Sequence, residues 1–162
     1  FSAELFDTYG GVFTRSTRYD ANVPRKKRNL RAPEPELHVF KTADGRVLRL
    51  TRYKGGKKGP VMFAHGLGVS SLIFSIDTID TNQLEYLIAA EYDCWLLDFR
   101  ASIDLPYAGT QWSGDDVALY DYPAAVAKIK AETGAASVRV ISLCFGPFAF
   151  SLALFADLEA VR

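Results

Sequence analysis

The sequence predicts an α/β fold that begins with a β-hairpin and continues with parallel strands joined by crossover helices. Three observations support this prediction. An Asp-Gly turn separates two runs of alternating apolar residues near the start, three short apolar runs follow, and segments with helical spacing lie between those runs. Apolar runs of this length are typical of strands that are buried on both faces of a parallel sheet. Strands that alternate with helices favour parallel pairing with right-handed crossovers.

The hairpin is predicted by residues 37–41 and 46–53, which flank Ala43-Asp44-Gly45. Asp-Gly between two alternating runs is a strong hairpin signal. Residues 1–36 are poorly patterned and contain a basic run at residues 25–28. We expect them to form an extended linker or the tail of a preceding domain, with the basic run as a solvated tether. The predicted folded domain occupies residues 37–162.

Apolar runs at residues 60–64, 94–97 and 138–143 predict three buried strands. Residues 82–91 and 115–133 carry apolar residues at helical spacing and predict the helices between these strands. We expect the second of these helices to kink at Pro123 and to end at Gly134, because proline lacks an N–H donor and glycine commonly ends helices. A last helix is predicted at residues 147–158, where the first turn can accept a proline.

Composition excludes several classes of partner. Lysine plus arginine total 19 and aspartate plus glutamate total 19, so the charge favours neither nucleic acid nor an anionic membrane as the main partner. The two cysteines lack the spacing of a disulfide framework or a metal site. No apolar run reaches the about 20 residues of a membrane span, and no secretory signal is visible. We expect a cytoplasmic chain, and we interpret it as a fragment because it begins with Phe1 and ends within the last helix.

A nucleophile elbow is predicted at Ser142-Leu143-Cys144-Phe145-Gly146, where the third buried strand turns into a helix. Such an elbow needs small residues two positions before and after the nucleophile. Ser142 and Gly146 meet this need if Cys144 is the nucleophile, whereas centring the elbow on Ser142 would place Val140 and Cys144 there. The positive end of the helix dipole would also favour a thiolate at Cys144. The alternative is a buried structural cysteine.

An oxyanion hole is predicted from the turn His65-Gly66-Leu67-Gly68, which follows the first buried strand. A glycine-rich turn can direct a backbone N–H towards a developing oxyanion. We expect the N–H group of Phe145 and that of Leu67 or its neighbour to provide two donors, each worth about 3 kcal/mol to the transition state. His65 is expected to be structural and, with Gly66, to support the turn. Ser142 and Gly146 support the elbow, and no metal site is expected.

This order of motifs resembles the α/β-hydrolase superfamily, and the residues within the motifs are most similar to those of the acid-lipase-like branch. The resemblance is carried by His65-Gly66-Leu67, residues 95–100, residues 115–124 and the elbow, and it spans roughly residues 37–162. It implies a truncated α/β-hydrolase fold and a lipase-like or esterase-like hydrolase or acyltransferase for carboxylic esters of a lipid or sterol. In that superfamily the catalytic acid and histidine follow later strands. His38 and His65 both precede Cys144, so we expect these 162 residues alone to be inactive.

A narrower resemblance is to the α/β-hydrolase domains appended to cholesterol-oxidase-like oxidoreductases of the glucose-methanol-choline class. It is carried by Ala43-Asp44-Gly45, residues 65–71, residues 80–82, residues 98–102 and the cysteine in the elbow. It implies an alternative function, a non-catalytic accessory domain, with residues 5–13 as the tail of the fused oxidoreductase. FAD would belong to that fused partner, and no cofactor is expected in this chain.

Asp98 and Asp104 border the predicted cleft and are candidate catalytic acids. A carboxylate beside Arg100 is more often part of a local ion pair, so we interpret them as ion-pair partners instead.

Overall fold

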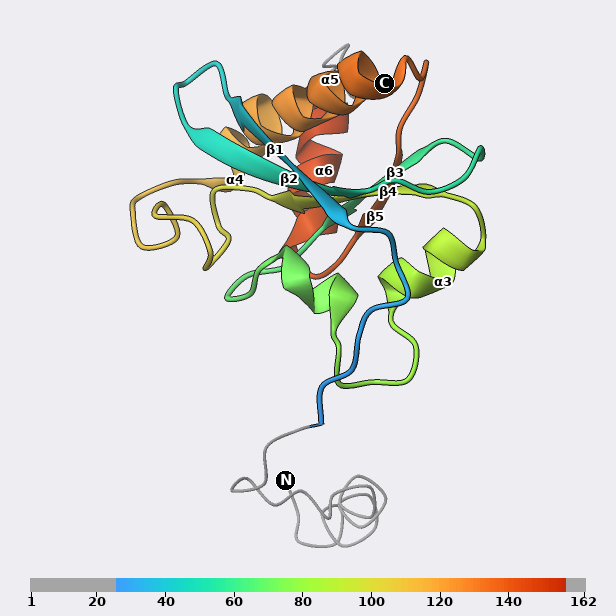
Figure 1. Ribbon diagram of the computed structural model, residues 1–162. Coiled ribbons are helices and arrows are strands. Elements are labelled where there is room, and N and C mark those ends of the chain that lie inside the picture. Colours follow the sequence, from blue (N-terminus) through green and yellow to red (C-terminus); the bar gives the residue numbers. More distant parts are fainter. Residues whose placement is uncertain (1–25, 157–162) are drawn as a thin grey trace, which may run out of the picture.

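The computed structural model describes residues 26–156, which form one five-stranded sheet with helices on both faces (Figure 1). The strands follow the order β1-β2-β4-β3-β5 across the sheet. Their bounds are β1 (Pro35–Lys41), β2 (Val47–Tyr53), β3 (Pro60–Ala64), β4 (Asp93–Asp98) and β5 (Arg139–Ser142). Strands β4, β3 and β5 are parallel to one another. The predicted α/β arrangement of a hairpin followed by three parallel strands is confirmed.

The hairpin joins β1 and β2 in antiparallel pairing, and β2 pairs antiparallel with β4. At the turn, the N–H of Thr42 donates to the carbonyl of Arg46 at 2.8 Å, and Gly45 has a φ of 90°. Glycine adopts such a positive φ without the steric cost that a side chain would add. The division of the chain at residue 36 stays a prediction, although β1 already begins at Pro35.

Residues 28–31 are held against α3 (Gln83–Ala89) by Glu85. The guanidinium of Arg28 donates to both carboxylate oxygens of Glu85, at 2.5 and 2.6 Å, and the N–H of Arg31 donates to the same group at 2.7 Å. The Glu85 side chain is 2% exposed. The expectation of a solvated tether is therefore wrong at Arg28. The predicted oxidoreductase tail, residues 5–13, lies outside the described residues.

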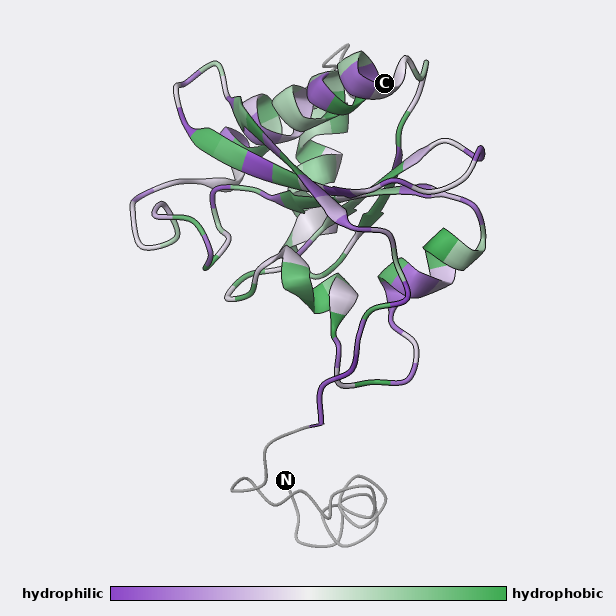
Figure 2. Ribbon diagram, viewed as in Figure 1, coloured by the Kyte–Doolittle hydropathy of each residue, from purple (hydrophilic) through white to green (hydrophobic). Residues whose placement is uncertain are grey.

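The two faces of the sheet are covered by different helices (Figure 1). The 3₁₀ helix η2 (Ser71–Ser75) and α3 lie on one face, and α5 (Tyr122–Thr133) and α6 (Phe145–Phe155) lie on the other. Hydrophobic residues concentrate in the strands between these layers (Figure 2). Within residues 26–156, no helix combines the length and the hydrophobicity that crossing a bilayer requires.

Side chains of the inner strands alternate between the two helical layers, as a strand dictates. On β3, Met62 and Ala64 belong to the apolar core beneath α5 and α6, whereas Val61 and Phe63 belong to the core beneath η2 and α3. All five residues of β3 and all six of β4 are buried. The prediction of buried inner strands is therefore confirmed for these two.

The helix predicted at residues 115–133 consists of three consecutive segments. They are α4 (Gly114–Asp116), the π-helical turn η3 (Val117–Asp121) and α5. Pro123 lies in the first turn of α5, but Asp121 and Tyr122 before it are already helical, so its missing N–H withdraws a donor from the preceding turn. A widened turn directly before the proline thus stands where the sequence predicts a kink. The helix ends as predicted at Gly134, which has a φ of 69°.

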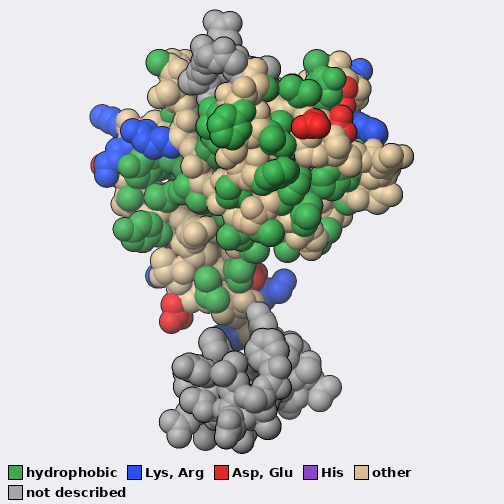
Figure 3. Space-filling model, turned by 180° about the vertical axis from the view of Figure 1, so that it is seen from behind, with side chains coloured by type: hydrophobic (Ala, Val, Ile, Leu, Met, Phe, Trp, Pro, Cys, Tyr) green, Lys and Arg blue, Asp and Glu red, His purple; other side chains and the backbone are tan. Residues whose placement is uncertain are grey.

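Strand β5 lies at the edge of the sheet rather than inside it. Within the described part of the chain it pairs with β3 alone, and its residues alternate between exposed and half-buried. Full burial of the third predicted strand is therefore wrong. Ile141 and Leu143 are exposed, as are Phe148 and Phe155 of α6. Hydrophobic side chains also cover much of the rear face of the molecule (Figure 3).

Candidate active site

Cys144 occupies the bend between β5 and α6 with φ 57° and ψ −109°. Non-glycine residues seldom adopt a positive φ, and holding one there costs roughly 1–3 kcal/mol. The side chain of Cys144 is exposed. The alternative of a buried structural cysteine is therefore wrong, and the thiol is presented to solvent by a strained turn.

Gly146 allows this bend to pack tightly against the end of β3. A β-carbon on Gly146 would lie 2.9 Å from the carbonyl oxygen of Ala64 and 3.1 Å from Cβ of Ser142. The Gly146 N–H donates to the carbonyl of Leu143 at 2.9 Å. The hydroxyl of Tyr122, from α5, donates to the Gly146 carbonyl at 3.0 Å. Small residues are therefore present where the predicted elbow requires them.

The structure brings the His65-Gly66-Leu67 turn and the elbow together. Strands β3 and β5 are parallel neighbours with Ala64 opposite Ser142, so both chains leave the sheet at the same edge. The N–H of Leu143 donates to the carbonyl of Ala64 at 3.0 Å. A β-carbon on Gly66 would lie 2.8 Å from Cβ of Cys144 and 3.4 Å from its Sγ. The backbone of the turn therefore passes directly beside the thiol.

The two amides predicted to form an oxyanion hole belong to these adjoining segments. Within residues 26–156, neither the N–H of Leu67 nor that of Phe145 donates to a protein acceptor. Phe145 is the first residue of α6, where N–H groups have no partner inside the helix. The role of these two N–H groups as oxyanion donors stays a prediction.

His65 supports the turn and does not face the thiol as a base. Its side chain is fully buried, stacks on Phe99 with ring centroids 4.2 Å apart, and places Nδ1 2.7 Å from the Gly66 carbonyl. A carbonyl only accepts, so Nδ1 carries the proton. Burial lowers the pKa of His65, while the Gly66 carbonyl and Asp98 act in the opposite direction. A neutral ring held in this way fits the predicted structural role.

His38, the second histidine, lies on β1, at the opposite edge of the sheet from β5. Its ring packs against Trp95, with centroids 4.9 Å apart. Neither histidine is therefore placed to take a proton from Cys144.

Asp98, the last residue of β4, pairs with Arg49 and not with Arg100. Its fully buried carboxylate accepts from the N–H and the hydroxyl of Ser71, each at 2.9 Å, and from Nη2 of Arg49 at 2.6 Å. Burial acts to raise the pKa of Asp98, but the bonds from Ser71 and Arg49 hold it below its ordinary value. The expected ion pair with Arg100 is wrong for Asp98. Asp104 also contacts Arg49, at 3.4 Å.

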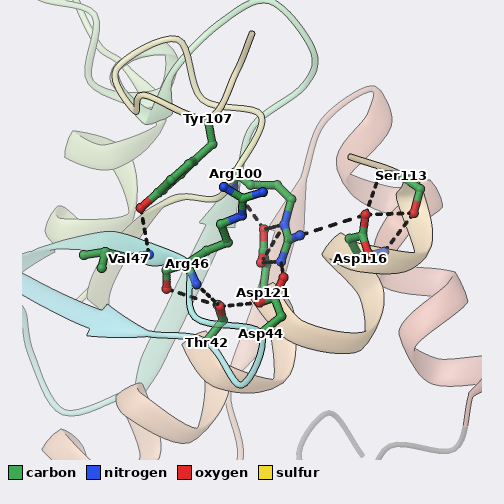
Figure 4. Close-up of polar contacts among 9 residues, drawn as sticks. All are labelled: Thr42, Asp44, Arg46, Val47, Arg100, Tyr107, Ser113, Asp116 and Asp121. Atoms are coloured by element: carbon green, nitrogen blue, oxygen red, sulfur yellow. Dashed lines mark hydrogen bonds and ion pairs between the residues drawn. The ribbon is translucent and has the colours of Figure 1, made fainter. Parts of the chain in front are cut away.

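Arg100 binds Asp121 instead and joins three elements (Figure 4). Its guanidinium donates to Asp121 at 2.7 Å, its backbone N–H donates to the same carboxylate at 3.0 Å, and Asp44 of the hairpin turn lies at 3.0 Å. Burial raises the pKa of Asp121, and Arg100 opposes that effect. The partners are 21 residues apart, and no spacing motif marks them.

Sequence reasoning missed Ser71 and the role of Asp98. A usable signal was present, because Ser71 follows the glycine-rich turn and Asp98 ends the strand next to β3. Parallel neighbours end at the same edge, so these polar residues were candidates for contact. Among residues 26–156, no group of three or more His, Cys, Asp or Glu side chains has a geometry that would hold a metal ion.

No family model matches the sequence. The lipase lipl-1 of Caenorhabditis elegans is 32% identical over 124 residues, which are 65% of this chain and 30% of the lipase. The esterase of Pyrococcus furiosus superposes with a TM-score of 0.61 at 20% identity, over 86% of this chain and 55% of the esterase. An α/β hydrolase of Novosphingobium aromaticivorans superposes with a TM-score of 0.53 at 17% identity, over 80% of this chain and 42% of that protein.

The chain thus spans about a third of the lipase and about half of each of these two structures. Its strand order, its elbow and these superpositions agree with one another. The chain has the α/β-hydrolase fold.

Proposed function

We propose that this chain belongs to the α/β-hydrolase superfamily and contributes Cys144 as the nucleophile of a hydrolase or acyltransferase for carboxylic esters. The observation that carries the proposal is the exposed thiol of Cys144, held at a positive φ directly beside the backbone of Gly66. A lipase and an esterase among the matched proteins support an ester as the substrate.

The proposed reaction begins when the Cys144 thiolate attacks the ester carbonyl carbon and a C–S bond forms. The carbonyl oxygen becomes an oxyanion that accepts hydrogen bonds from the amides of Leu67 and Phe145. Collapse of this intermediate re-forms the carbonyl, breaks the C–O bond and releases the alcohol, which takes up the proton that the thiol lost. Water, or a second alcohol, then attacks the thioester carbonyl. The C–S bond breaks, the carboxylic acid or the new ester leaves, and the proton of the attacking O–H group passes to the thiolate, which restores the thiol.

The proton transfers in this scheme require a base that His38 and His65 do not supply. His38 is on the far edge of the sheet and His65 is enclosed beneath the turn. The proposal therefore requires a histidine from outside these 162 residues for turnover. Acylation of Cys144 by an activated ester has no such requirement, because a good leaving group departs unprotonated.

Exposed apolar side chains beside the thiol favour an apolar, lipid-like or sterol-like ester. Leu67 is next to Gly66, Leu143 precedes Cys144, and Phe148 lies one turn into α6. These three side chains are 52%, 46% and 57% exposed. Apolar surface of this kind gains free energy when it binds a hydrocarbon chain.

The proposal is tested by comparing two reactions of Cys144 in the 162-residue chain. Acylation by p-nitrophenyl acetate passes through an oxyanion, whereas alkylation by iodoacetamide does not. We expect the ratio of the acylation rate to the alkylation rate to be at least about 10-fold higher in the folded chain than in the chain unfolded by urea. Cys144→Ala should abolish both reactions. Cys94→Ala removes the buried thiol and should change neither reaction of the folded chain. This variant also supplies the unfolded reference, because urea exposes Cys94 and would otherwise add the reactivity of a second thiol.

An equal ratio in the folded and unfolded chains would contradict the proposal and favour the non-catalytic accessory domain. A fused oxidoreductase partner remains part of that alternative. In a longer protein that contains this chain, esterase activity that survives Cys144→Ala would also contradict the cysteine nucleophile.

A further inference from the structure

The turn beside Cys144, residues 65–70, is anchored at both of its ends. At its start, the Ala64 carbonyl accepts the N–H of Leu143 from the elbow at 3.0 Å. At its end, Ser71 donates both its N–H and its hydroxyl to the carboxylate of Asp98, each at 2.9 Å. The position of the turn relative to the thiol therefore depends on a carboxylate that belongs to β4.

The carboxylate of Asp98 is itself fixed from two further directions. Arg49 of β2 donates to it through Nε at 3.0 Å and through Nη2 at 2.6 Å, and the hydroxyl of Ser102 donates at 2.8 Å. The Asp98 side chain is 0% exposed. Charge-assisted bonds in a buried site are strong and directional, so the carboxylate has one well-defined orientation. The position of Ser71 therefore depends on the orientation of the Asp98 carboxylate.

We propose that Asp98 is a positioning residue, which acts through Ser71 to hold the Leu67 amide towards the thiol of Cys144. This inference rests on the proposed function. Asp98 itself is buried and does not contact the substrate. If the carboxylate is lost, the turn can move relative to Sγ, and a displacement of about 1 Å lowers a rate by as much as about 100-fold.

The test measures the acylation and alkylation of Cys144 in variants of the full chain. We expect Asp98→Asn to lower the ratio of acylation to alkylation by about 10-fold or more. Ser71→Ala should lower this ratio by a smaller factor, because the backbone N–H still reaches Asp98. Ser71→Thr keeps the hydroxyl and should retain the wild-type ratio. In each variant the alkylation rate should stay close to that of the wild type, because alkylation forms no oxyanion.

Asp104→Asn is the matched control. Asp104 contacts the same guanidinium of Arg49, at 3.4 Å, but within residues 26–156 its side chain makes no hydrogen bond to Ser71. This variant should keep the wild-type ratio. A ratio that falls equally in Asp104→Asn and Asp98→Asn would overturn the inference, because it would trace the effect to Arg49 and not to Ser71.

Two results separate failure of this inference from failure of the proposed function. In the first, the ratio of acylation to alkylation is higher in the folded wild type than in the unfolded chain, and it does not change in Asp98→Asn or Ser71→Ala. This result overturns the positioning role alone. A wild-type ratio equal to that of the unfolded chain overturns both. A parallel fall of acylation and alkylation indicates general loosening and also overturns the positioning role. If Asp98→Asn does not fold, Ser71→Ala and Ser71→Thr provide the test. A lower ratio in Ser71→Ala than in Ser71→Thr supports the positioning role, and equal ratios overturn it.

Discussion

Gly66 lies so close to Cys144 that a β-carbon on the glycine would be 2.8 Å from Cβ of the cysteine and 3.4 Å from its Sγ. Carbon atoms that are not bonded to each other do not approach to 2.8 Å without strong repulsion. The absence of a side chain at Gly66 is therefore what allows the turn after β3 to lie against the elbow after β5. Leu67, whose amide is a predicted oxyanion donor, directly follows Gly66 in this turn.

Gly66→Ala should separate the turn from the elbow. We expect the acylation rate of Cys144, relative to its alkylation rate, to fall by about 10- to 100-fold because the oxyanion donors are displaced. The free energy of unfolding should fall by about 1–3 kcal/mol through overpacking. Rates with p-nitrophenyl acetate and iodoacetamide, together with urea unfolding, measure both effects. Gly109→Ala adds a β-carbon with nothing within 4 Å and should change neither. An unaltered ratio in Gly66→Ala would show that the turn is not involved.

Cys144→Gly should stabilise the chain while it removes the thiol. The φ of 57° at Cys144 strains a residue that has a β-carbon, and glycine relieves this strain. Because glycine also gains entropy in the unfolded chain, the net gain should be about 1 kcal/mol. Urea unfolding at neutral pH measures the difference. Cys144→Ala keeps the β-carbon and should give no gain, so equal midpoints for the two variants would argue against backbone strain at the elbow.

Much of the fold could be predicted because its signals are local. Asp44-Gly45 marks the hairpin turn, and Gly134 ends the long helix with a φ of 69°. Asn82 and Glu85 form a capping box at the start of α3. The contact between the Gly66 turn and Cys144 could be anticipated too, because two local motifs follow strands of one parallel sheet.

The remaining features depend on contacts between distant residues. Asp98 is close to Arg100 in the sequence, but its guanidinium partner is Arg49, which is 49 residues away. Arg28 donates a hydrogen bond to Glu85, which is 57 residues away in the sequence. The basic run has the composition of a solvated tether, yet its last residue is bound to α3. The exposure of β5 depends on which strand lies beside it, and no local pattern specifies that neighbour.

Arg100→Leu should destabilise the fold strongly. It leaves the carboxylate of Asp121 buried without its partner, and a broken buried ion pair costs about 3–5 kcal/mol. Asp44→Asn weakens a contact of the same guanidinium, but the Asp44 side chain is 24% exposed, so we expect a loss of about 1 kcal/mol or less. Urea unfolding compares the two variants. Equal losses would show that burial of Asp121 does not dominate this network.

Ile141→Lys should reduce self-association of the 162-residue chain. Strand β5 pairs on one side only within residues 26–156, and an open apolar edge pairs readily with other chains. A lysine on this edge opposes such pairing through its charge and hydration. Light scattering over a range of concentrations measures the change. Tyr86→Lys, which alters an exposed residue of α3 away from the sheet edge, is the control, and an equal reduction there would point to net charge as the cause.

Glu85→Gln should make the stability of the chain less sensitive to acid. Hydrogen bonds from Arg28, and then from the Arg31 and Asn82 backbones, hold the pKa of Glu85 well below its usual range, against the opposing effect of burial. In the unfolded chain a glutamate has a pKa of about 4.3. Since the folded value is the lower one, the carboxylate stabilises the fold above about pH 4.3, and this contribution is lost as the pH falls towards the folded value.

The wild type should therefore be clearly more stable than Glu85→Gln at pH 7. The difference in the free energy of unfolding between the two proteins should decrease steadily from about pH 5 to pH 2. Urea unfolding midpoints at several pH values measure this difference. Glu34→Gln removes an exposed carboxylate and serves as the control. A difference that stays constant across the range would mean that Glu85 stabilises α3 through its shape and hydrogen bonds, with no contribution from the charge that Arg28 neutralises.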